Sequence, residues 1–137
     1  MLFNMLYHIM YWYFFYHYFM VVIVAWNVRG IISSTLCLSA LLDREHCDIA
    51  IISEHKLKHE SRMYLDSIHR DFYSIVRIDD NQLHNDGSFS GKGGVAIMYR
   101  KSLSFSVKEI SCFDFNCVVG IQLTDSSGNS WYIFGVQ

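Results

Sequence analysis

The sequence predicts an α/β fold in which two helices flank a sheet. Two unbroken apolar runs, residues 21–26 and 49–52, have the composition of strands that are buried on both faces. Between them, residues 36–44 carry leucines at roughly helical spacing. Because a strand, a helix and a second strand of these lengths form a crossover unit, we expect the two apolar runs to lie in one sheet.

Each apolar run ends in a side chain that carries an oxygen donor. Asn27 follows the first run, and Glu54 follows the second after a single serine. The end of a buried strand is a rigid support for a metal ligand, and Mg²⁺ requires near-octahedral oxygen geometry. If the two strands pair, both side chains reach the same edge of the sheet. We therefore predict that Asn27 and Glu54 begin a divalent-metal site.

The other elements follow from turn residues and apolar spacing. Ser33 and Ser34 are the expected N-caps of the first helix. His55 and His59 stand four residues apart, but the zinc signature HExxH is absent, so we expect solvated histidines. The remaining chain predicts a second helix over residues 56–69, a polar loop over residues 79–91, and strands over residues 72–78, 95–99, 105–110, 117–123 and 130–136.

The glycines around Lys92 are interpreted as a tight turn. A phosphate-binding P-loop needs GxxxxGK followed by serine or threonine, and it opens a helix. Here Gly93 follows the lysine, and the next residues predict a strand. Lys92 stays a candidate for contact with a substrate phosphate.

Three motifs occur in a fixed order along the chain. They are Trp-Asn-Val-Arg-Gly at 26–30, Asp-Ile-Ala-Ile-Ile-Ser-Glu-His at 48–55 and Gly-Gly-Val-Ala-Ile at 93–97. Together they resemble the endonuclease/exonuclease/phosphatase superfamily, and most closely the endonuclease domains of LINE-type retrotransposons. The resemblance covers residues 21–136 and implies a DNase I-like α/β sandwich with a mixed, mostly antiparallel sheet, truncated to roughly its N-terminal half.

The resemblance also implies a chemistry. Members of the family hydrolyse phosphodiester or phosphomonoester bonds with a divalent metal that polarises the phosphate. By this resemblance, Glu54 would supply the carboxylate that binds the metal, and Asn27 would assist in binding it. Both would be catalytic residues, and the cofactor would be Mg²⁺ or Mn²⁺. The later aspartates and the terminal Ser-Asp-His of the family have no counterpart before Gln137. We therefore expect a phosphodiesterase fragment that is inactive alone, and whether the chain is an enzyme stays open.

An apolar, aromatic extension, residues 1–20, precedes the partial nuclease domain that we expect at residues 21–137. The apolar run continues to residue 24, long enough to span a bilayer, which takes about 20 residues. It lacks lysine and arginine before Arg29, however, and contains Asn4 and two histidines. Three interpretations compete: the segment is a poor membrane anchor, an extra apolar helix packed on the domain, or an extension that was never selected to fold. We favour the last, because residues 21–25 are needed as the first strand.

Composition bears on the partners. The net charge of -2 gives no basic field that would attract nucleic acid at long range. Nucleic acid nevertheless stays the ancestral substrate that the resemblance implies, beside phospholipid or inositol head groups. Four cysteines without zinc-ribbon spacing or disulfide density favour an intracellular protein. The alternative function is a small protein without catalytic role, either membrane-associated through residues 1–24 or an interaction module. The oligomeric state stays open.

Overall fold

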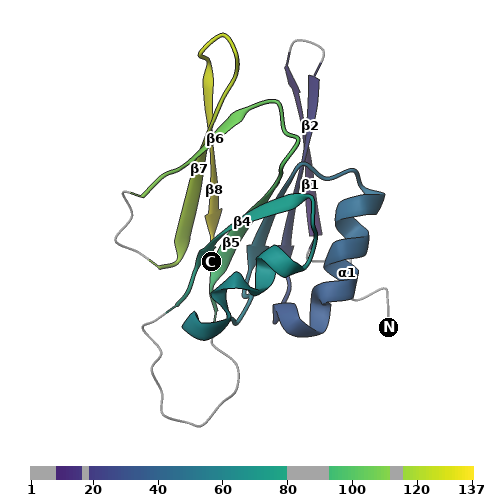
Figure 1. The fold of residues 1–137 in the computed structure, drawn as a ribbon, viewed down its shortest axis with the longest axis vertical. Helices are drawn as coiled ribbons and strands as arrows, with labels where there is room; N and C mark the ends of the chain where they lie inside the picture. Colours follow the sequence, from purple (N-terminus) through teal and green to yellow (C-terminus); the bar gives the residue numbers. More distant parts are fainter. Residues whose placement is uncertain (1–8, 17–18, 80–92, 112–115) are drawn as a thin grey trace.

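The computed structural model describes residues 9–16, 19–79, 93–111 and 116–137. Two sheets pack face to face, and helices cover the outer face of the larger sheet (Figure 1). The five-stranded sheet contains β1 (Ile9–Tyr16), β2 (Phe19–Asn27), β3 (Ile49–Ser53), β4 (Phe72–Arg77) and β5 (Val95–Arg100). The three-stranded sheet contains β6 (Ser106–Glu109), β7 (Val118–Thr124) and β8 (Ser130–Val136), and the helices are α1 (Ile31–Arg44) and the 3₁₀ helix η2 (His59–Ser67).

The larger sheet is mixed, as expected from the sequence. Its strand order is β1-β2-β3-β5-β4, and β2 and β3 are parallel because α1 carries the chain from one to the other. The other described pairs of this sheet are antiparallel. The α/β class, the mostly antiparallel sheet and the two helices are therefore confirmed.

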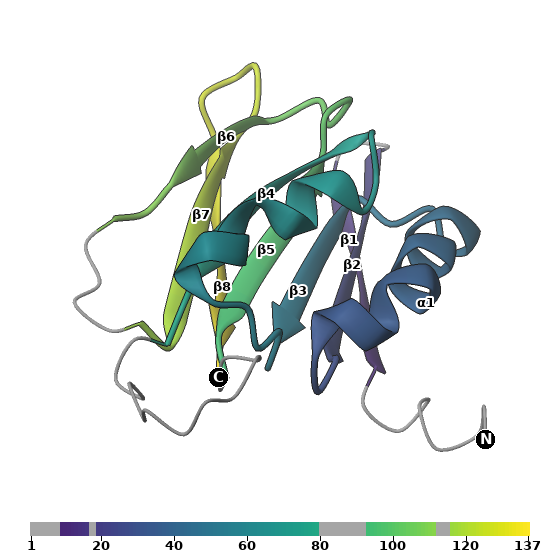
Figure 2. The ribbon, with the colours of Figure 1, turned by 60° about the horizontal axis from the view of Figure 1, so that its bottom comes forward.

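The larger sheet lies between the helices and the smaller sheet (Figure 2). An apolar core packs on each of its two faces. The first lies between this sheet and the helices. Its members on α1 are Ile31, Leu38, Leu41 and Leu42. Together with the buried Ser34, they recur at the three- and four-residue spacing of one helix face. The second core lies between the two sheets and includes Val21, Ile49, Val95, Ile97, Val119, Ile121 and Leu123.

The first helix begins at Ile31 with Gly30 as N-cap, so the expected caps Ser33 and Ser34 were wrong. The backbone after β3 satisfies the first amide groups of the helix instead. Gly30 N donates to Glu54 O at 2.8 Å, and Ile31 N donates to His55 O at 3.0 Å. The amides of the N-cap and of the first helical residue therefore have backbone partners, and the helix has no side-chain cap.

The second helix is shorter than expected and has 3₁₀ geometry, His59–Ser67 instead of 56–69. Glu54 and Lys56 have φ angles of 53° and 57°. These left-handed conformations cannot belong to a right-handed helix. The segment between β3 and η2 is therefore an irregular turn that leads away from Glu54.

Residues 9–16 form β1, which the sequence analysis did not expect, because it placed residues 1–20 outside the sheet. β1 pairs antiparallel with β2, from Ile9 opposite Trp26 to Tyr16 opposite Phe19. Ile9 and Tyr11 pack against the helix-side core. β2 accordingly starts at Phe19, inside the expected extension. The domain boundary at residue 21 stays a prediction.

In the described part of the chain, no helix has both the length and the apolar character needed to cross a bilayer.

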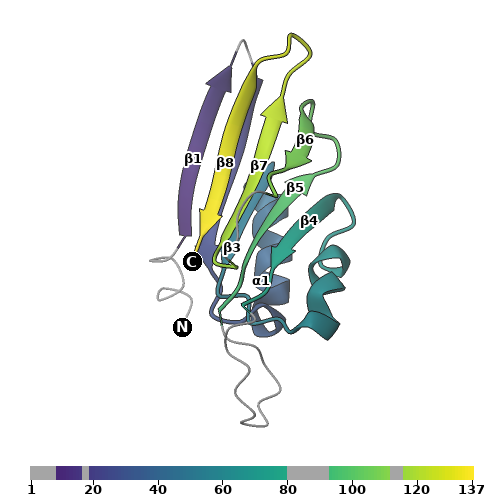
Figure 3. The ribbon, with the colours of Figure 1, turned by 90° about the vertical axis from the view of Figure 1, so that its left-hand side faces the viewer.

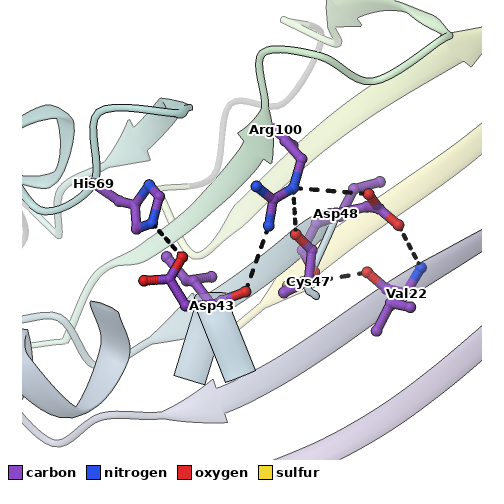
Figure 4. Close-up of polar contacts among 8 residues, drawn as sticks. Val22, Asp43, Cys47, Asp48, His69 and Arg100 are labelled. Atoms are coloured by element: carbon purple, nitrogen blue, oxygen red, sulfur yellow. Dashed lines mark hydrogen bonds and ion pairs between the residues drawn. The ribbon is translucent and has the colours of Figure 1, made fainter. Parts of the chain in front are cut away.

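A polar cluster ties α1 to the larger sheet at the end of β3 that lies away from Glu54 (Figure 4). Arg100 Nε donates to Cys47 O at 3.0 Å, and Arg100 Nη2 donates to Leu42 O at 3.5 Å. On the neighbouring strand, Val22 N donates to Asp48 Oδ2 at 2.9 Å. The guanidinium of Arg100 thus satisfies carbonyls in and just after the last turn of α1.

Replacing Arg100 with methionine is expected to lower the free energy of unfolding by about 1–3 kcal/mol, because buried carbonyls lose a charged donor. The guanidinium also stacks 4.7 Å from the ring centroid of Phe72. Urea unfolding of the purified chain measures the change. Arg70→Met is the matched control, since the side chain of Arg70 is 93% exposed, and it should change stability by less than about 0.5 kcal/mol. Equal losses in both variants would contradict the role of Arg100.

Candidate functional site

The side chains of Asn27 and Glu54 meet at one edge of the larger sheet. β2 and β3 are parallel, and Asn27 is the register partner of Ser53, the residue before Glu54. Asn27 Nδ2 donates a hydrogen bond to Glu54 Oε1 at 2.8 Å. The structure therefore brings together the two residues that the sequence singles out.

The backbone on both sides of this contact is locked. Val28 N donates to Ser53 O at 3.1 Å, and Gly30 N donates to Glu54 O. Arg29 N donates to Asn27 Oδ1 at 3.1 Å, which fixes the amide of Asn27 so that its NH₂ group faces Glu54. Arg29 and Glu54 both have φ near 50°. Such conformations cost roughly 1–3 kcal/mol for residues other than glycine and cluster at functional sites.

These donors fit a hard divalent cation. Glu54 contributes a carboxylate, and one accepted hydrogen bond leaves most of its roughly four lone-pair sites available. The amide oxygen of Asn27 accepts from Arg29 N, and its NH₂ group supports the carboxylate of Glu54. Among the residues that the structure describes, no three or more His, Cys, Asp or Glu gather as a metal cluster. A single carboxylate is a donor that suits Mg²⁺, which keeps several waters and takes one or two protein carboxylates plus substrate phosphates.

His55 is buried, only 1% exposed, whereas the sequence analysis expected a solvated side chain. Leu57 N donates to His55 Nδ1 at 3.0 Å. Since Nδ1 is the acceptor, the proton is on Nε2, which donates to Arg77 O at 2.9 Å. Burial lowers the pKa of His55. The imidazole beside Glu54 is thus neutral, and both its nitrogens are engaged with the backbone.

The protein should lose stability as the pH falls from 7 to 5, and His55→Gln should reduce that loss. The unfolded chain binds a proton at His55 below about pH 6.5, whereas the folded state, with its lowered pKa, resists protonation. Unfolding therefore takes up a proton, and acid favours it by up to about 1.4 kcal/mol per pH unit. Urea unfolding across this range, with EDTA present, measures the difference. The same dependence of unfolding free energy on pH in the wild-type chain and in His55→Gln would contradict this prediction.

The glycine turn predicted before β5 lies beside Glu54. Lys56 N donates to Gly93 O at 2.7 Å, and His55 N donates to Gly94 O at 3.4 Å. Gly94 has φ of 91°, and a Cβ atom there would overlap the imidazole of His55. The absence of a side chain at Gly94 leaves room for the buried ring of His55. Lys92, the candidate phosphate contact, lies outside the described residues.

Comparison with known proteins bears on the family and on the fold. A profile of the Endonuclease/Exonuclease/phosphatase family matches residues 24–135. Among solved structures, the chain is similar to an AP endonuclease from Leishmania major, with a TM-score of 0.67 and 12% sequence identity. That match covers 84% of this chain and 39% of the AP endonuclease chain, and at this identity it concerns the fold alone. No curated protein sequence matches.

Proposed function

Because the chain belongs to the endonuclease/exonuclease/phosphatase family and has the DNase I-like α/β fold, we propose that Asn27 and Glu54 hold the divalent metal of a phosphoric-ester hydrolase site. The observation that carries this proposal is the 2.8 Å hydrogen bond between Asn27 Nδ2 and Glu54 Oε1 at the ends of adjacent parallel strands. It joins a carboxylate and an amide on rigid elements, as a Mg²⁺ or Mn²⁺ site requires.

The two residues have different roles in this site. Glu54 supplies the negative charge that attracts the cation, and Asn27 orients the carboxylate through its NH₂ group. A bound ion supplies Lewis acidity that polarises a phosphoryl oxygen. The locked turns after β2 and β3 hold both side chains, so little conformational freedom is lost when an ion binds.

We further propose that this chain alone has negligible hydrolytic activity. An in-line attack by water needs a group that accepts or donates a proton near the metal. His55, the imidazole next to Glu54, is neutral and bonded at both nitrogens to backbone groups. It therefore stabilises the turn and does not move protons. As substrate class we propose a phosphodiester of nucleic acid, because the similar solved structure is that of an AP endonuclease.

A plasmid-nicking assay tests the proposal. The purified chain with Mg²⁺ and supercoiled DNA should show no nicking above the buffer control, while the same sample still binds Mn²⁺. Turnover that Glu54→Ala abolishes and Glu60→Ala leaves intact would overturn the proposed inactivity. Glu60 is the matched control because its side chain is exposed on η2.

The LINE-type relationship and the membrane association through residues 1–24 stay predictions. Neither the family match nor the fold comparison distinguishes between branches of the family.

A further inference from the structure

A hydroxyl group lies beside the pair of Asn27 and Glu54. Ser53 is the last residue of β3 and the register partner of Asn27 on β2. Side chains alternate between the two faces of a sheet, and both Ile51 on β3 and Ile23 on β2 pack against the core between the sheets. Ser53 follows Ile51 by two residues and Asn27 follows Ile23 by four, so both side chains belong to this inner face. Since neighbouring strands lie about 4.8 Å apart, Ser53 and Asn27 are direct neighbours.

Ser53 lies at the rim of the space between the two sheets. The smaller sheet packs over β3 through β8 (Figure 3), and a Cβ atom at Gly135 would lie 2.8 Å from Ile51 Cγ2. Ser53, two residues further along β3, is half-buried. Its backbone is fixed, because Ser53 O accepts from Val28 N at 3.1 Å and β3 pairs with a strand on each side. The hydroxyl is therefore carried by a rigid element next to Glu54.

Within the part of the chain that the structure describes, the hydroxyl of Ser53 makes no hydrogen bond. The nearby serine hydroxyls on α1 differ in this respect. Ser33 Oγ donates to Gly30 O at 3.2 Å, and Ser34 Oγ donates to Val28 O at 3.1 Å. Because polar groups that are removed from bulk water normally have a partner, a half-buried hydroxyl of this kind is suited to bind an ion or a water molecule.

Asn27 and His55, the two polar neighbours of Glu54 described above, are engaged by other groups. The amide oxygen of Asn27 accepts from Arg29 N, and its NH₂ group donates to Glu54. Both nitrogens of His55 are bonded to the backbone. Mg²⁺ prefers oxygen ligands, and a serine or threonine hydroxyl holds this ion in P-loop NTPases. The hydroxyl of Ser53 is an oxygen of the same kind.

We propose that the hydroxyl of Ser53 binds the divalent cation together with the carboxylate of Glu54. It contributes a neutral oxygen, so the site has a second protein ligand without a second negative charge. The last residue of β3 and the residue that follows it then hold the ion together. The inference rests on the proposed metal site, because Ser53 acts on the ion that Glu54 attracts.

Titration of the full chain with Mn²⁺ tests the proposal. Ser53→Ala should weaken Mn²⁺ binding about fivefold, the effect of one lost polar contact. Ser53→Thr keeps the hydroxyl and should retain the wild-type affinity. Ser106→Ala is the matched control, since Ser106 is exposed at the start of β6 in the other sheet, and it should leave Mn²⁺ binding unchanged. Wild-type affinity in Ser53→Ala, or equal losses in Ser53→Ala and Ser53→Thr, would overturn the proposal.

Glu54→Gln in the same titration separates this inference from the proposed function. If Glu54→Gln loses Mn²⁺ affinity and Ser53→Ala does not, Ser53 is not a ligand, although the metal site at Glu54 stands. If neither variant changes the Mn²⁺ affinity, the metal site itself is wrong, and the inference about Ser53 falls with it.

A soft metal ion gives a signature that a structural role of Ser53 would not produce. Ser53→Cys replaces the hydroxyl with a thiol, and thiolates prefer soft metal ions. Cd²⁺ should give this variant the ultraviolet charge-transfer absorption of a cadmium–thiolate bond, beyond that of the wild-type chain with its four cysteines. Adding Glu54→Gln should weaken this Cd²⁺ binding about tenfold. Equal absorption in Ser106→Cys, or Cd²⁺ binding that does not depend on Glu54, would overturn the proposal.

Discussion

Replacing Glu54 with glutamine is expected to weaken Mn²⁺ binding by more than about tenfold, because even residues that only support a metal ligand contribute about 10- to 100-fold to affinity. Glutamine keeps the size of the side chain and can still accept the hydrogen bond from Asn27, so the fold should be preserved. What it removes is the negative charge at the end of β3. Titration of the purified chain with Mn²⁺, followed by calorimetry or by the electron paramagnetic resonance of free Mn²⁺, measures the change.

Two further variants make this result specific. Glu60→Gln removes one negative charge from the exposed surface of η2 and should leave Mn²⁺ affinity unchanged. Asn27→Asp should instead strengthen Mn²⁺ binding, since it places a second carboxylate beside Glu54. Without metal, the two carboxylates repel each other. Unchanged Mn²⁺ affinity in Glu54→Gln would remove the basis of the metal proposal.

The sequence predicted that Asn27 and Glu54 lie close together because local rules decide their positions; their role at a metal stays a prediction. Each residue ends a buried apolar run, and a parallel pairing of two such strands through one helix leaves a single edge where both can lie. The helix caps were predicted less well. Gly30 and Ile31 donate to carbonyls after β3, and a window of local sequence does not contain those acceptors.

β1 was not predicted, because its formation also depends on a partner that lies outside the local sequence. Its run of aromatic and apolar residues, IMYWYFFY, has no polar alternation, so periodicity does not separate a strand from a membrane segment or a buried helix. The pairing with β2 decides the outcome, because β2 offers an edge on the side away from β3. The burial of His55 likewise depends on contacts made only after folding, with Arg77 and Gly94.

Gly94→Ala is expected to lower the free energy of unfolding by about 3 kcal/mol or more, the largest effect on stability that we predict. Two costs add. The φ of 91° is unfavourable for any residue with a Cβ, at about 1–3 kcal/mol. The new methyl group would also overlap the ring of His55, and overpacking costs a further 1–3 kcal/mol or so. The ring cannot move aside without losing its hydrogen bonds to Leu57 and Arg77.

The turn at Gly128 separates the two costs. Gly128 has φ of 86°, close to that of Gly94, but a Cβ atom there would meet nothing within 4 Å. Gly128→Ala should therefore show the backbone cost alone, about 1 kcal/mol. The excess loss in Gly94→Ala should shrink in a His55→Ala background, because the smaller side chain leaves room for the methyl group. Equal losses in Gly94→Ala and Gly128→Ala, measured by urea unfolding, would show that His55 does not pack against this turn in solution. In that case, the side chain of His55 would not stabilise the turn that positions Glu54.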